Sequence, residues 1–492
     1  MMSLPSNPGQ LALERLPAYT ELRRLWAVLP RARLVGGAVR DLALGVDAAD
    51  VDLATPEPPD VVMNILADAG IRTVPTGLSH GTVTAVLNGR GLEITTLRRD
   101  EETDGRHAVV SWTTDWREDA ARRDFTINAL SCDSDGVVHD YFGGLTDLAA
   151  GRVRFVGDPG ERIHEDALRV LRFFRFQGRF GVGQADPEAL FAIRAMAGRV
   201  RRLSVERVWS EFRRILRGPR ADDMVMLMAE TGVLQDVLPE LLARGGVAEV
   251  QAAAERLARL VDSGAPREEY VGLAALLWAP PSEGAAADGE LAESSASRLR
   301  LSRADQERVR AILQAPPMTP SQSDAELRRA AADTSVAVLV DRAWLDQALT
   351  AEPLRRGDAS EGSSSRDCQP KAKDGLLDVS PDDAALPGDA VLRGEWSTGA
   401  PSKIRAQSGE RETTGGPDAN AWTTLRGRLS RLRAPEFPLA GRDIVALGVA
   451  PGAEVGRILA ETGQWWRMGG CLADRGECLA WASRLIERAR TP

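Results

Sequence analysis

The stretch RARLVGGAVRDLALGVDAADVDLAT, residues 31–55, decides the fold of the N-terminal part of the chain. Its pattern predicts a short strand, a sharp turn at Gly36 and Gly37, a helix that ends by Gly45, and a second strand. The turn lets the backbone approach an anion, and the free N–H groups at the start of the helix that carries Arg40 favour a phosphate there. The stretch therefore predicts a phosphate-binding strand, turn and helix.

The second strand, DVDLAT, carries two carboxylates. Asp50 and Asp52 are two residues apart, and the period of two along a strand points both to one face while Val51 and Leu53 point to the core. Such a pair suits a divalent cation. A D-x-D pair alone is more often a solvated strand face, and a Gly-Gly pair alone is usually a simple turn. Their succession favours nucleotidyl transfer, in which Mg²⁺ bridges a triphosphate and activates a hydroxyl nucleophile.

Length and composition favour a multidomain protein of the cytoplasm. The 492 residues exceed what one core holds and predict about three or four domains. Residues 1–30 contain no continuous apolar run, and no stretch reaches the roughly 20 apolar residues of a membrane span, so we expect no signal peptide and no membrane partner. The net charge of −9 disfavours a general polyanion binder. Outside residues 371–403, however, all basic residues are arginines, which suit forked contacts with phosphate, although a GC-rich genome gives the same bias.

Neither the cysteines nor the histidines form a recognisable metal motif. The four cysteines are Cys132, Cys368, Cys471 and Cys478. They contain no C-x-x-C pair, which disfavours a zinc site or a disulfide framework. Cys471 and Cys478 are expected to lie in helices. His139 and Asp140 form a nominal HD pair of the kind found in phosphohydrolases. Only His164 lies downstream of that pair, so we reject a hydrolase.

Further strands and a long polar connection are expected after the opening stretch. The pattern predicts one helix and then three strands, at residues 59–69, 72–75, 81–87 and 92–97. The last strand carries Glu93, which either completes a three-carboxylate metal site with Asp50 and Asp52 or is an edge-strand charge. Residues 98–116 form a long polar connection, which in a compact domain is usually mobile or functional.

The segment EDAARRDFTINAL places polar residues before an apolar run. Arg122 and Arg123 precede Asp124, and Asn128 follows at helical spacing. Two adjacent arginines are commonly only surface charge. Here the apolar run would hold them rigidly, so we interpret them as ligands of an anion.

A helix is predicted over residues 158–181, DPGERIHEDALRVLRFFRFQGRFG, with one cationic face. Its charged residues recur every three or four positions: Arg162, Asp166, Arg169, Arg172, Arg175 and Arg179. The stripe contains one acid, Asp166, three residues before Arg169 and therefore its neighbour. Cytosine and adenine present an amino donor beside a ring-nitrogen acceptor, and uracil and guanine present the reverse. An acid–arginine pair would therefore admit CTP and ATP and reject UTP and GTP; the alternative is a solvated helix face.

Together these motifs resemble the class II tRNA nucleotidyltransferases, the CCA-adding enzyme family that also includes bacterial poly(A) polymerases. The resemblance rests on LVGGAVRDLALG with DVD, RRDFTINAL, DYFGGLTDL, EDALRVLRFFRF and SVERVWSEF, the last with Glu206, Arg207 and Glu211. It covers residues 30–240 densely. The number of motifs in this order makes chance agreement negligible.

The resemblance implies an α+β fold, in which a small N-terminal nucleotidyltransferase domain with a mixed β-sheet precedes an all-α neck, body and tail. The expected parts are the catalytic head at 1–155, the neck with base recognition at 156–240, the body at 241–353, an insert at 354–420 and a tRNA-binding tail at 421–492. The insert is rich in Ser, Gly and Pro, which predicts disorder. Beyond residue 181 we expect helices, with Ser204 as an N-cap and one helix over residues 296–313.

The resemblance also implies a role for each site residue. Asp50 and Asp52 would hold Mg²⁺, and Glu93 would be the third catalytic carboxylate. The nucleotide-binding residues would be Gly36, Gly37 and Arg40 at the triphosphate, Arg123, Asp124 and Asn128 at the nucleotide and its ribose, and Asp166, Arg169, Arg172 and Arg175 at the base. Residues 98–116 correspond to the flexible loop that the family needs to switch from C to A addition, and their full length favours complete CCA addition.

The leading hypothesis is therefore template-independent addition of C, C and A to the tRNA 3′ end from CTP and ATP, with release of pyrophosphate by a two-metal mechanism. The expected partners are tRNA and these nucleotides, not DNA. A poly(A) polymerase and an A-adding or CC-adding enzyme of the same family are alternatives, although no basic C-terminal extension is visible. A catalytically inactive RNA-binding protein is disfavoured because every expected metal and nucleotide residue is present.

Overall fold

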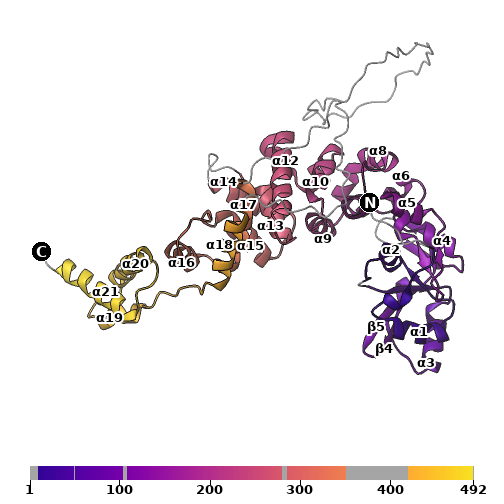
Figure 1. Cartoon of the computed structure of the whole chain (residues 1–492), viewed down its shortest axis with the longest axis horizontal. Coiled ribbons are helices and arrows are strands. Elements are labelled where there is room, and N and C mark those ends of the chain that lie inside the picture. Colours follow the sequence, from indigo (N-terminus) through magenta and orange to yellow (C-terminus); the bar gives the residue numbers. More distant parts are fainter. Residues whose placement is uncertain (1–8, 49, 104–107, 280–284, 351–418, 491–492) are drawn as a thin grey trace, which may run out of the picture. The chain divides into compact units, whose positions relative to one another are not determined.

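The computed structural model describes the chain apart from residues 1–8, 49, 104–107, 280–284, 351–418 and 491–492 (Figure 1). The expected insert, residues 354–420, falls almost wholly outside the described residues, so its disorder stays a prediction. Within the described ranges, no helix combines the length and the apolar character that crossing a lipid bilayer requires.

A seven-stranded mixed sheet forms the centre of the head. In chain order its strands are β1 (Arg33–Val35), β2 (Asp52–Thr55), β3 (Arg72–Gly77), β4 (Thr82–Leu87), β5 (Arg90–Thr96), β8 (Ser131–Cys132) and β9 (Val138–His139). The strand order across the sheet is β3-β4-β5-β2-β1-β8-β9. The pair β2 and β5 is parallel, and the other neighbours in this sheet are antiparallel. The predicted mixed sheet is confirmed.

Short helices connect these strands. They are η1 (Leu13–Arg15), α1 (Tyr19–Val28), α2 (Gly37–Ala43), α3 (Pro59–Asp68), η2 (Leu78–His80), α4 (Trp116–Ala121), η3 (Thr126–Asn128) and α5 (Gly144–Ala150). The strand predicted to include Asp50 begins only at Asp52. Strand β1 ends at Val35 and the chain turns at Gly36, so β1 does not extend far enough to pair with Asp50. Asp50 therefore lies in the loop before β2.

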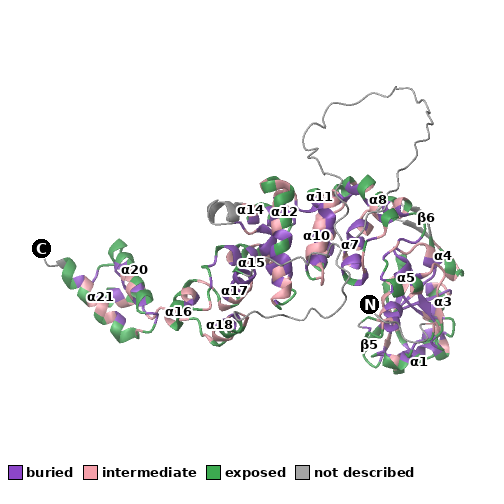
Figure 2. Ribbon diagram, turned by 45° about the horizontal axis from the view of Figure 1, so that its top comes forward, coloured by how far each residue is buried: buried purple, intermediate pink, exposed green. Residues whose placement is uncertain are grey.

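The sheet has one covered face and one open face. Leu53 of β2 and Ile94 of β5 are fully buried in one cluster with side chains of α1 and α3 (Figure 2). Alternation along both strands then places Asp52 and Glu93 on the opposite face. There only a small apolar cluster, against which Trp116 packs, covers part of the sheet. The predicted carboxylate face is therefore solvent-accessible.

Residues 98–116, expected to be a loop, begin as an antiparallel ribbon. Strand β6 (Arg98–Thr103) pairs with β7 (Ala108–Trp112), and the connecting residues 104–107 lie outside the described residues. The backbone N–H of Thr113 donates to the carbonyl of Leu97 at 2.9 Å and closes the base of the ribbon. The two strands were not predicted from the sequence, because a ribbon outside the main sheet needs no apolar alternation, and the expected mobility or function of this connection stays a prediction. The Asp-Gly pair in the sequence between the two strands was the available hairpin signal.

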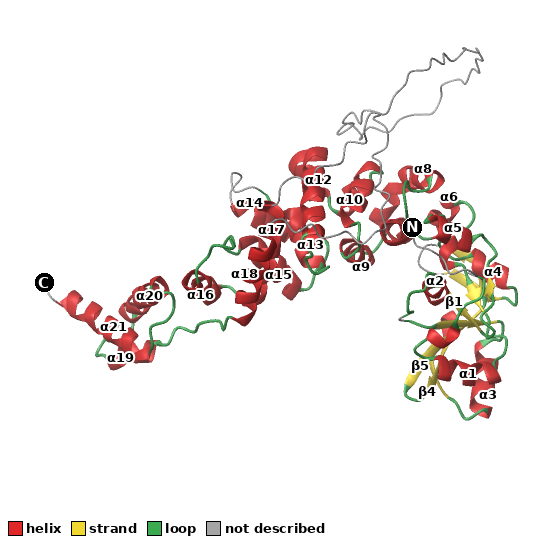
Figure 3. Cartoon of the chain, viewed as in Figure 1, coloured by secondary structure: helices red, strands yellow, loops and turns green. Residues whose placement is uncertain are grey.

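After the head, the described residues form helices alone (Figure 3). They are α6 (Pro159–Glu165), α7 (Leu168–Phe180), α8 (Pro187–Met196), η4 (Ala197–Arg202), α9 (Val205–Leu216), α10 (Ala221–Glu230), α11 (Leu234–Val237), α12 (Pro239–Asp262), α13 (Glu269–Leu277), α14 (Ala285–Arg298), α15 (Arg303–Gln314), α16 (Asp324–Asp333), α17 (Val336–Thr350), α18 (Ala419–Arg431), α19 (Gly441–Ala446), α20 (Ala453–Met468) and α21 (Arg475–Arg490). This arrangement confirms the α+β class. The boundaries proposed between neck, body and tail stay predictions.

Two local expectations were wrong, and a third is confirmed in position only. The helix predicted over residues 296–313 is two helices, because Arg300 between α14 and α15 has a positive φ of 50°. Ser204 is the N-cap residue of α9, as predicted, but its side chain makes no capping hydrogen bond. Cys471 lies in the turn after α20 with a φ of 59°, and only Cys478 is helical.

An aromatic cluster joins the head to α7. Phe125 and Phe155 of the head have ring centroids 4.9 Å apart, and Phe173 of α7 stacks on Phe155 at 5.9 Å. All three side chains are fully buried. This packing fixes α7 against the segment that carries the RRD motif.

Candidate active site

The Gly36–Gly37 turn has the sharp backbone that the sequence predicts. Gly36 has a φ of 66°, which glycine adopts without steric strain, and its N–H donates to the carbonyl of Leu130 at 3.1 Å. A Cβ at Gly36 would lie 3.1 Å from Nη1 of Arg123. Glycine therefore leaves room for this guanidinium, and the structure brings the turn and Arg123 together.

Two of the three expected catalytic carboxylates lie side by side. Asp52 and Glu93 are register partners on the parallel strands β2 and β5. Burial raises the pKa of Asp52, the negative charges of Glu93 and Asp50 raise it further, and Arg123 lowers it. Asp52 therefore lies close enough to each of these three side chains to interact with it electrostatically.

The carboxylates of Asp50, Asp52 and Glu93 suit a divalent cation, because a bound cation would relieve the repulsion among their negative charges. In the described part of the chain, however, no three acidic, histidine or cysteine side chains form a ready coordination shell. The metal site at Asp50 and Asp52 therefore stays a prediction. Closure of the carboxylates around an ion would accompany binding.

A chain of hydrogen bonds links Arg40 to α7. Arg40 is buried, and its Nη1 donates to Oδ1 of Asn128 at 2.5 Å. The Asn128 amide donates to Oδ1 of Asp124 at 3.1 Å, and Oδ2 of Asp124 accepts from Nε of Arg172 at 2.7 Å. Burial alone raises the pKa of Asp124, but the charge of Arg172 and the hydrogen bonds that it accepts hold it below its usual value. Four of the predicted nucleotide-binding residues thus form one network.

A buried carboxylate that the sequence interpretation missed holds the arginine pair of the RRD motif. Asp119 of α4 accepts from Nε and Nη2 of Arg122 at 2.9 and 2.7 Å, and from Nη2 of Arg123 at 3.2 Å. It also accepts from the backbone N–H of Arg98 at 3.3 Å. The sequence spacing could have predicted these pairs, because Asp119 stands three residues before Arg122 and four before Arg123, and residues at these spacings are neighbours on a helix.

The helix predicted over residues 158–181 is two helices. Asp166 between α6 and α7 has an extended backbone, with φ −149° and ψ 105°. Its Oδ1 accepts from the N–H of Leu168 at 3.0 Å, and its Oδ2 accepts from Arg207 of α9 at 2.8 Å. The prediction was wrong because this acid satisfies the free N–H groups of α7 and is held by a residue distant in sequence.

Arg169 and Asp166, predicted to be a side-chain pair, have different partners. Nη1 of Arg169 donates to the carbonyl of Arg162 at 3.0 Å and to Glu165. Its Nη2 donates to the carbonyl of Arg122 at 3.0 Å. The structure therefore ties Arg169 to the end of α6 and to the RRD motif.

The next arginines of α7 are held by an acid and an aromatic ring. Arg175 forms an ion pair with Glu211 of α9 at 2.8 Å. Burial lowers the pKa of Arg175 to about 10, against the opposing charge of Glu211. The guanidinium carbons of Arg172 and Arg175 lie 5.4 and 4.5 Å from the ring centroid of Phe176. These contacts fix the part of the predicted stripe that lies on α7, whereas Arg162 lies on α6.

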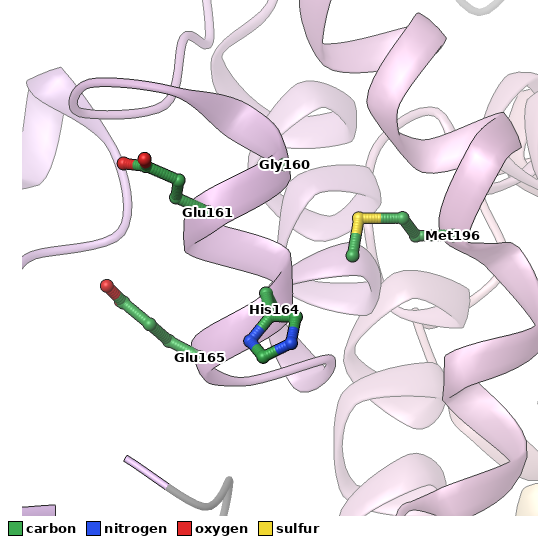
Figure 4. Close-up of a pocket in the computed structure, with 5 residues that line it drawn as sticks. All are labelled: Gly160, Glu161, His164, Glu165 and Met196. Carbon is green, nitrogen blue, oxygen red and sulfur yellow. The ribbon is translucent and has the colours of Figure 1, made fainter. Parts of the chain in front are cut away.

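A pocket of about 530 Å³ lies next to this stripe, between α6 and the end of α8. Gly160, Glu161, His164 and Glu165 of α6 line one side, and Met196 points toward His164 from the other (Figure 4). Because Glu165 also accepts from Arg169, this pocket borders the predicted base-recognition region without containing it.

Two family models match the part of the chain that holds these residues. Residues 32–154 match the poly A polymerase head domain, and residues 184–244 match the probable RNA and SrmB-binding site of polymerase A. Over this region the chain is similar to the family of CCA-adding enzymes and poly(A) polymerases. The resemblance expected from the motifs is thereby supported.

Relatives of this family agree over the same half of the chain. The chain is 45% identical over 227 residues to the mitochondrial CCA tRNA nucleotidyltransferase 1 of Danio rerio, covering 46% of this chain and 52% of the relative. It is 42% identical over 234 residues to the CCA-adding enzyme of Geobacillus sp. (strain WCH70), covering 47% and 56%. The chain thus spans about half the length of the curated relatives it matches.

Solved structures of the family share the fold over most of the chain. The Bacillus stearothermophilus CCA-adding enzyme in complex with CTP has a TM-score of 0.67 at 24% identity, covering 96% of this chain and 98% of that one. The Thermotoga maritima CCA-adding enzyme complexed with tRNA has a TM-score of 0.57 at 18% identity, covering 96% and 97%. At these identities the likeness concerns the fold.

Proposed function

We propose that this protein is a CCA-adding nucleotidyltransferase, which adds C, C and A without a template to the 3′ end of tRNA from CTP and ATP. One observation carries the proposal: Asp52 and Glu93 stand in register on the open face of the sheet, where Arg123 meets the Gly36 turn. This brings acidic ligands for a cation and a basic ligand for a phosphate to one place. The names of the relatives point to the same reaction.

In the proposed reaction the terminal ribose hydroxyl of the RNA forms a bond to the α-phosphorus of the nucleotide, and pyrophosphate leaves with the broken P–O bond. Asp50, Asp52 and Glu93 would hold Mg²⁺, which when bound supplies charge neutralisation at the triphosphate and activation of the hydroxyl. Arg123 binds the phosphates at the turn. Two of its five N–H donors are used in the described contacts, so it retains donors for a phosphate.

Base selection in the proposal falls to Asp166 and Arg169. A carboxylate has about four acceptor positions, and the side chain of Asp166 uses two, for Leu168 and Arg207. It therefore retains capacity for the amino group of cytosine or adenine. The described contacts of Arg169 leave its Nε–H and one Nη2–H for the ring nitrogen. Both nucleotides present this pair of groups, so one site serves CTP and ATP.

The test is incorporation of each labelled nucleotide, with Mg²⁺, into tRNA transcripts that end at the discriminator base, at C and at CC. Addition that stops after CCA supports the proposal. Asp52→Asn is expected to lower turnover by more than about 100-fold, because losing a metal ligand costs at least as much as losing an outer-shell partner. Asp47→Asn is the matched control, since that carboxylate is 82% exposed and pairs only with Arg15 in the described contacts.

Other results of this assay would indicate a different function. Long A tails on unrelated RNA would identify a poly(A) polymerase, a reading that the name of the matching head-domain model favours. Addition that stops after CC, or only A addition to a CC end, would identify a partial enzyme. No incorporation of any nucleotide would leave an RNA-binding protein.

A further inference from the structure

The two arginines of the RRD motif are held unequally, although they are adjacent in sequence. Arg122 engages Oδ1 of Asp119 with both Nε and Nη2, at 2.9 and 2.7 Å. Arg123 engages Oδ2 through Nη2 alone, at 3.2 Å. Asp119 therefore holds Arg122 through two neighbouring nitrogens of the guanidinium, whereas it holds Arg123 through one.

The free end of Arg123 faces the site. Its Nη1 lies 3.1 Å from where a Cβ of Gly36 would be, and it makes only a long contact of 3.4 Å to the carbonyl of Asn128. The guanidinium thus stands at the glycine turn, and two of its five N–H donors are used in the described contacts.

Asp119 holds Arg123 in this position through a buried ion pair. Its side chain is 3% exposed, against 20% for Arg123, so its ion pairs lie in a poorly solvated place where they are strong. Arg122 and Arg123 hold the pKa of Asp119 below its usual value in spite of burial, which raises it, so the carboxylate stays charged. Without this charge, Arg123 would lose the ion pair that joins it to α4 at 3.2 Å.

We propose that Asp119 is a positioning residue, which tethers Arg123 at the glycine turn for the phosphates of the incoming nucleotide. The inference rests on the proposed nucleotidyltransferase function. It makes Arg122 a structural residue, because Asp119 holds both Nε and Nη2 of its guanidinium and its backbone carbonyl accepts from Arg169. It makes Arg123 the member of the pair that meets the ligand.

The test is a double-mutant cycle of Asp119→Asn and Arg123→Ala in the full chain, read by calorimetric titration of CTP in EDTA. Losing one positioned charge-assisted contact is expected to weaken CTP binding by about 10-fold in each single variant. The double variant is expected to bind no more weakly than Arg123→Ala alone, because Asp119 acts through Arg123. A merely structural role for Asp119 would instead give additive losses, and additivity overturns the proposal.

The matched control is Asp147→Asn. Asp147 is also a buried carboxylate of the head that pairs with two arginines, Arg152 and Arg154, but it does not contact the RRD arginines. Its variant is expected to bind CTP as the wild type does, at a comparable loss of thermal stability. Equal loss of CTP binding in both variants would mean that buried charge in general, and not Asp119, supports the site.

Comparison of the wild type with Asp119→Asn separates this inference from the proposed function. Wild-type protein that binds no nucleotide would refute the proposed function, whereas normal CTP binding by Asp119→Asn would refute only the positioning role. Should Asp119→Asn fail to fold, Asp119→Glu keeps the charge but displaces it, and the same non-additivity with Arg123→Ala is expected.

Discussion

Replacing Asp124 with Asn tests whether the head and α7 are joined through this carboxylate. In the structure Oδ2 of Asp124 accepts from Nε and Nη2 of Arg172 at 2.7 and 2.5 Å. Its Oδ1 accepts from the N–H of Phe125 at 2.8 Å and from Asn128 at 3.1 Å. An Asn side chain retains only one acceptor oxygen, so it loses one of these two sets of hydrogen bonds.

The magnitude follows from the contacts that are lost. Two charge-assisted hydrogen bonds at about 1.5 kcal/mol each amount to about 3 kcal/mol. Arg172 is 31% exposed, and solvent screening reduces the coupling between Asp124 and Arg172 to about 2 kcal/mol. A cycle of Asp124→Asn, Arg172→Met and the double variant isolates this coupling, because contributions from the rest of the chain cancel. Urea unfolding of the full chain, followed by tryptophan fluorescence, gives the four free energies.

The lowered pKa of Asp124 predicts how the coupling between Asp124 and Arg172 changes with pH. The folded pKa of Asp124 is below its usual value, so its contribution is fully present above the unfolded pKa of about 3.9 and is lost as pH falls through the lower folded pKa. We therefore expect a constant coupling from pH 6 to 8 and its disappearance in strong acid. A coupling below about 0.5 kcal/mol at pH 7, or one that grows on acidification, would refute the reasoning.

The remaining predictions concern packing and reactivity. Gly144→Ala is expected to lower the free energy of unfolding by roughly 2 kcal/mol or more, because the added Cβ would clash with the backbone carbonyl oxygen of Thr126. The control is Gly198→Ala, whose added Cβ meets open space and should leave the melting temperature nearly unchanged. Phe173→Ala should cost about 3–5 kcal/mol in the same melting experiment, and Phe191→Ala, at a side chain 76% exposed, almost nothing. Burial raises the pKa of Cys132 to about 12, so iodoacetamide at pH 8 should label it only in unfolded protein; labelling of the native protein, seen by peptide mass spectrometry, would contradict this.

The parts of the fold that sequence predicted well are those that local patterns specify. The Gly36 turn, the period-two strands around Asp52 and Glu93, and the amphipathic helices after residue 181 each leave a regular trace within one segment. The resemblance of the motifs added the roles of the residues, and the structure brings Arg40, Asn128, Asp124 and Arg172 into one network.

The parts that sequence missed depend on partners far along the chain. Asp166 interrupts a helical pattern because Arg207, on another helix, holds it, and no local pattern contains that contact. The ribbon of β6 and β7 was missed because it stands apart from the main sheet. Asp119 was passed over because an acid near two arginines is common on exposed helices, and only its burial distinguishes it.

The interruption at Asp166 has a consequence for variation among related chains. A continuous helix turns by about 100° per residue, so an insertion or deletion early in it would rotate every later side chain. With the backbone extended at Asp166, α6 and α7 are separate segments, and the angular spacing of Arg169, Arg172 and Arg175 is set within α7 alone. A change of length early in α6 therefore need not rotate the arginines of α7, whereas the end of α6 is constrained, because Glu165 and the carbonyl of Arg162 both accept from Arg169.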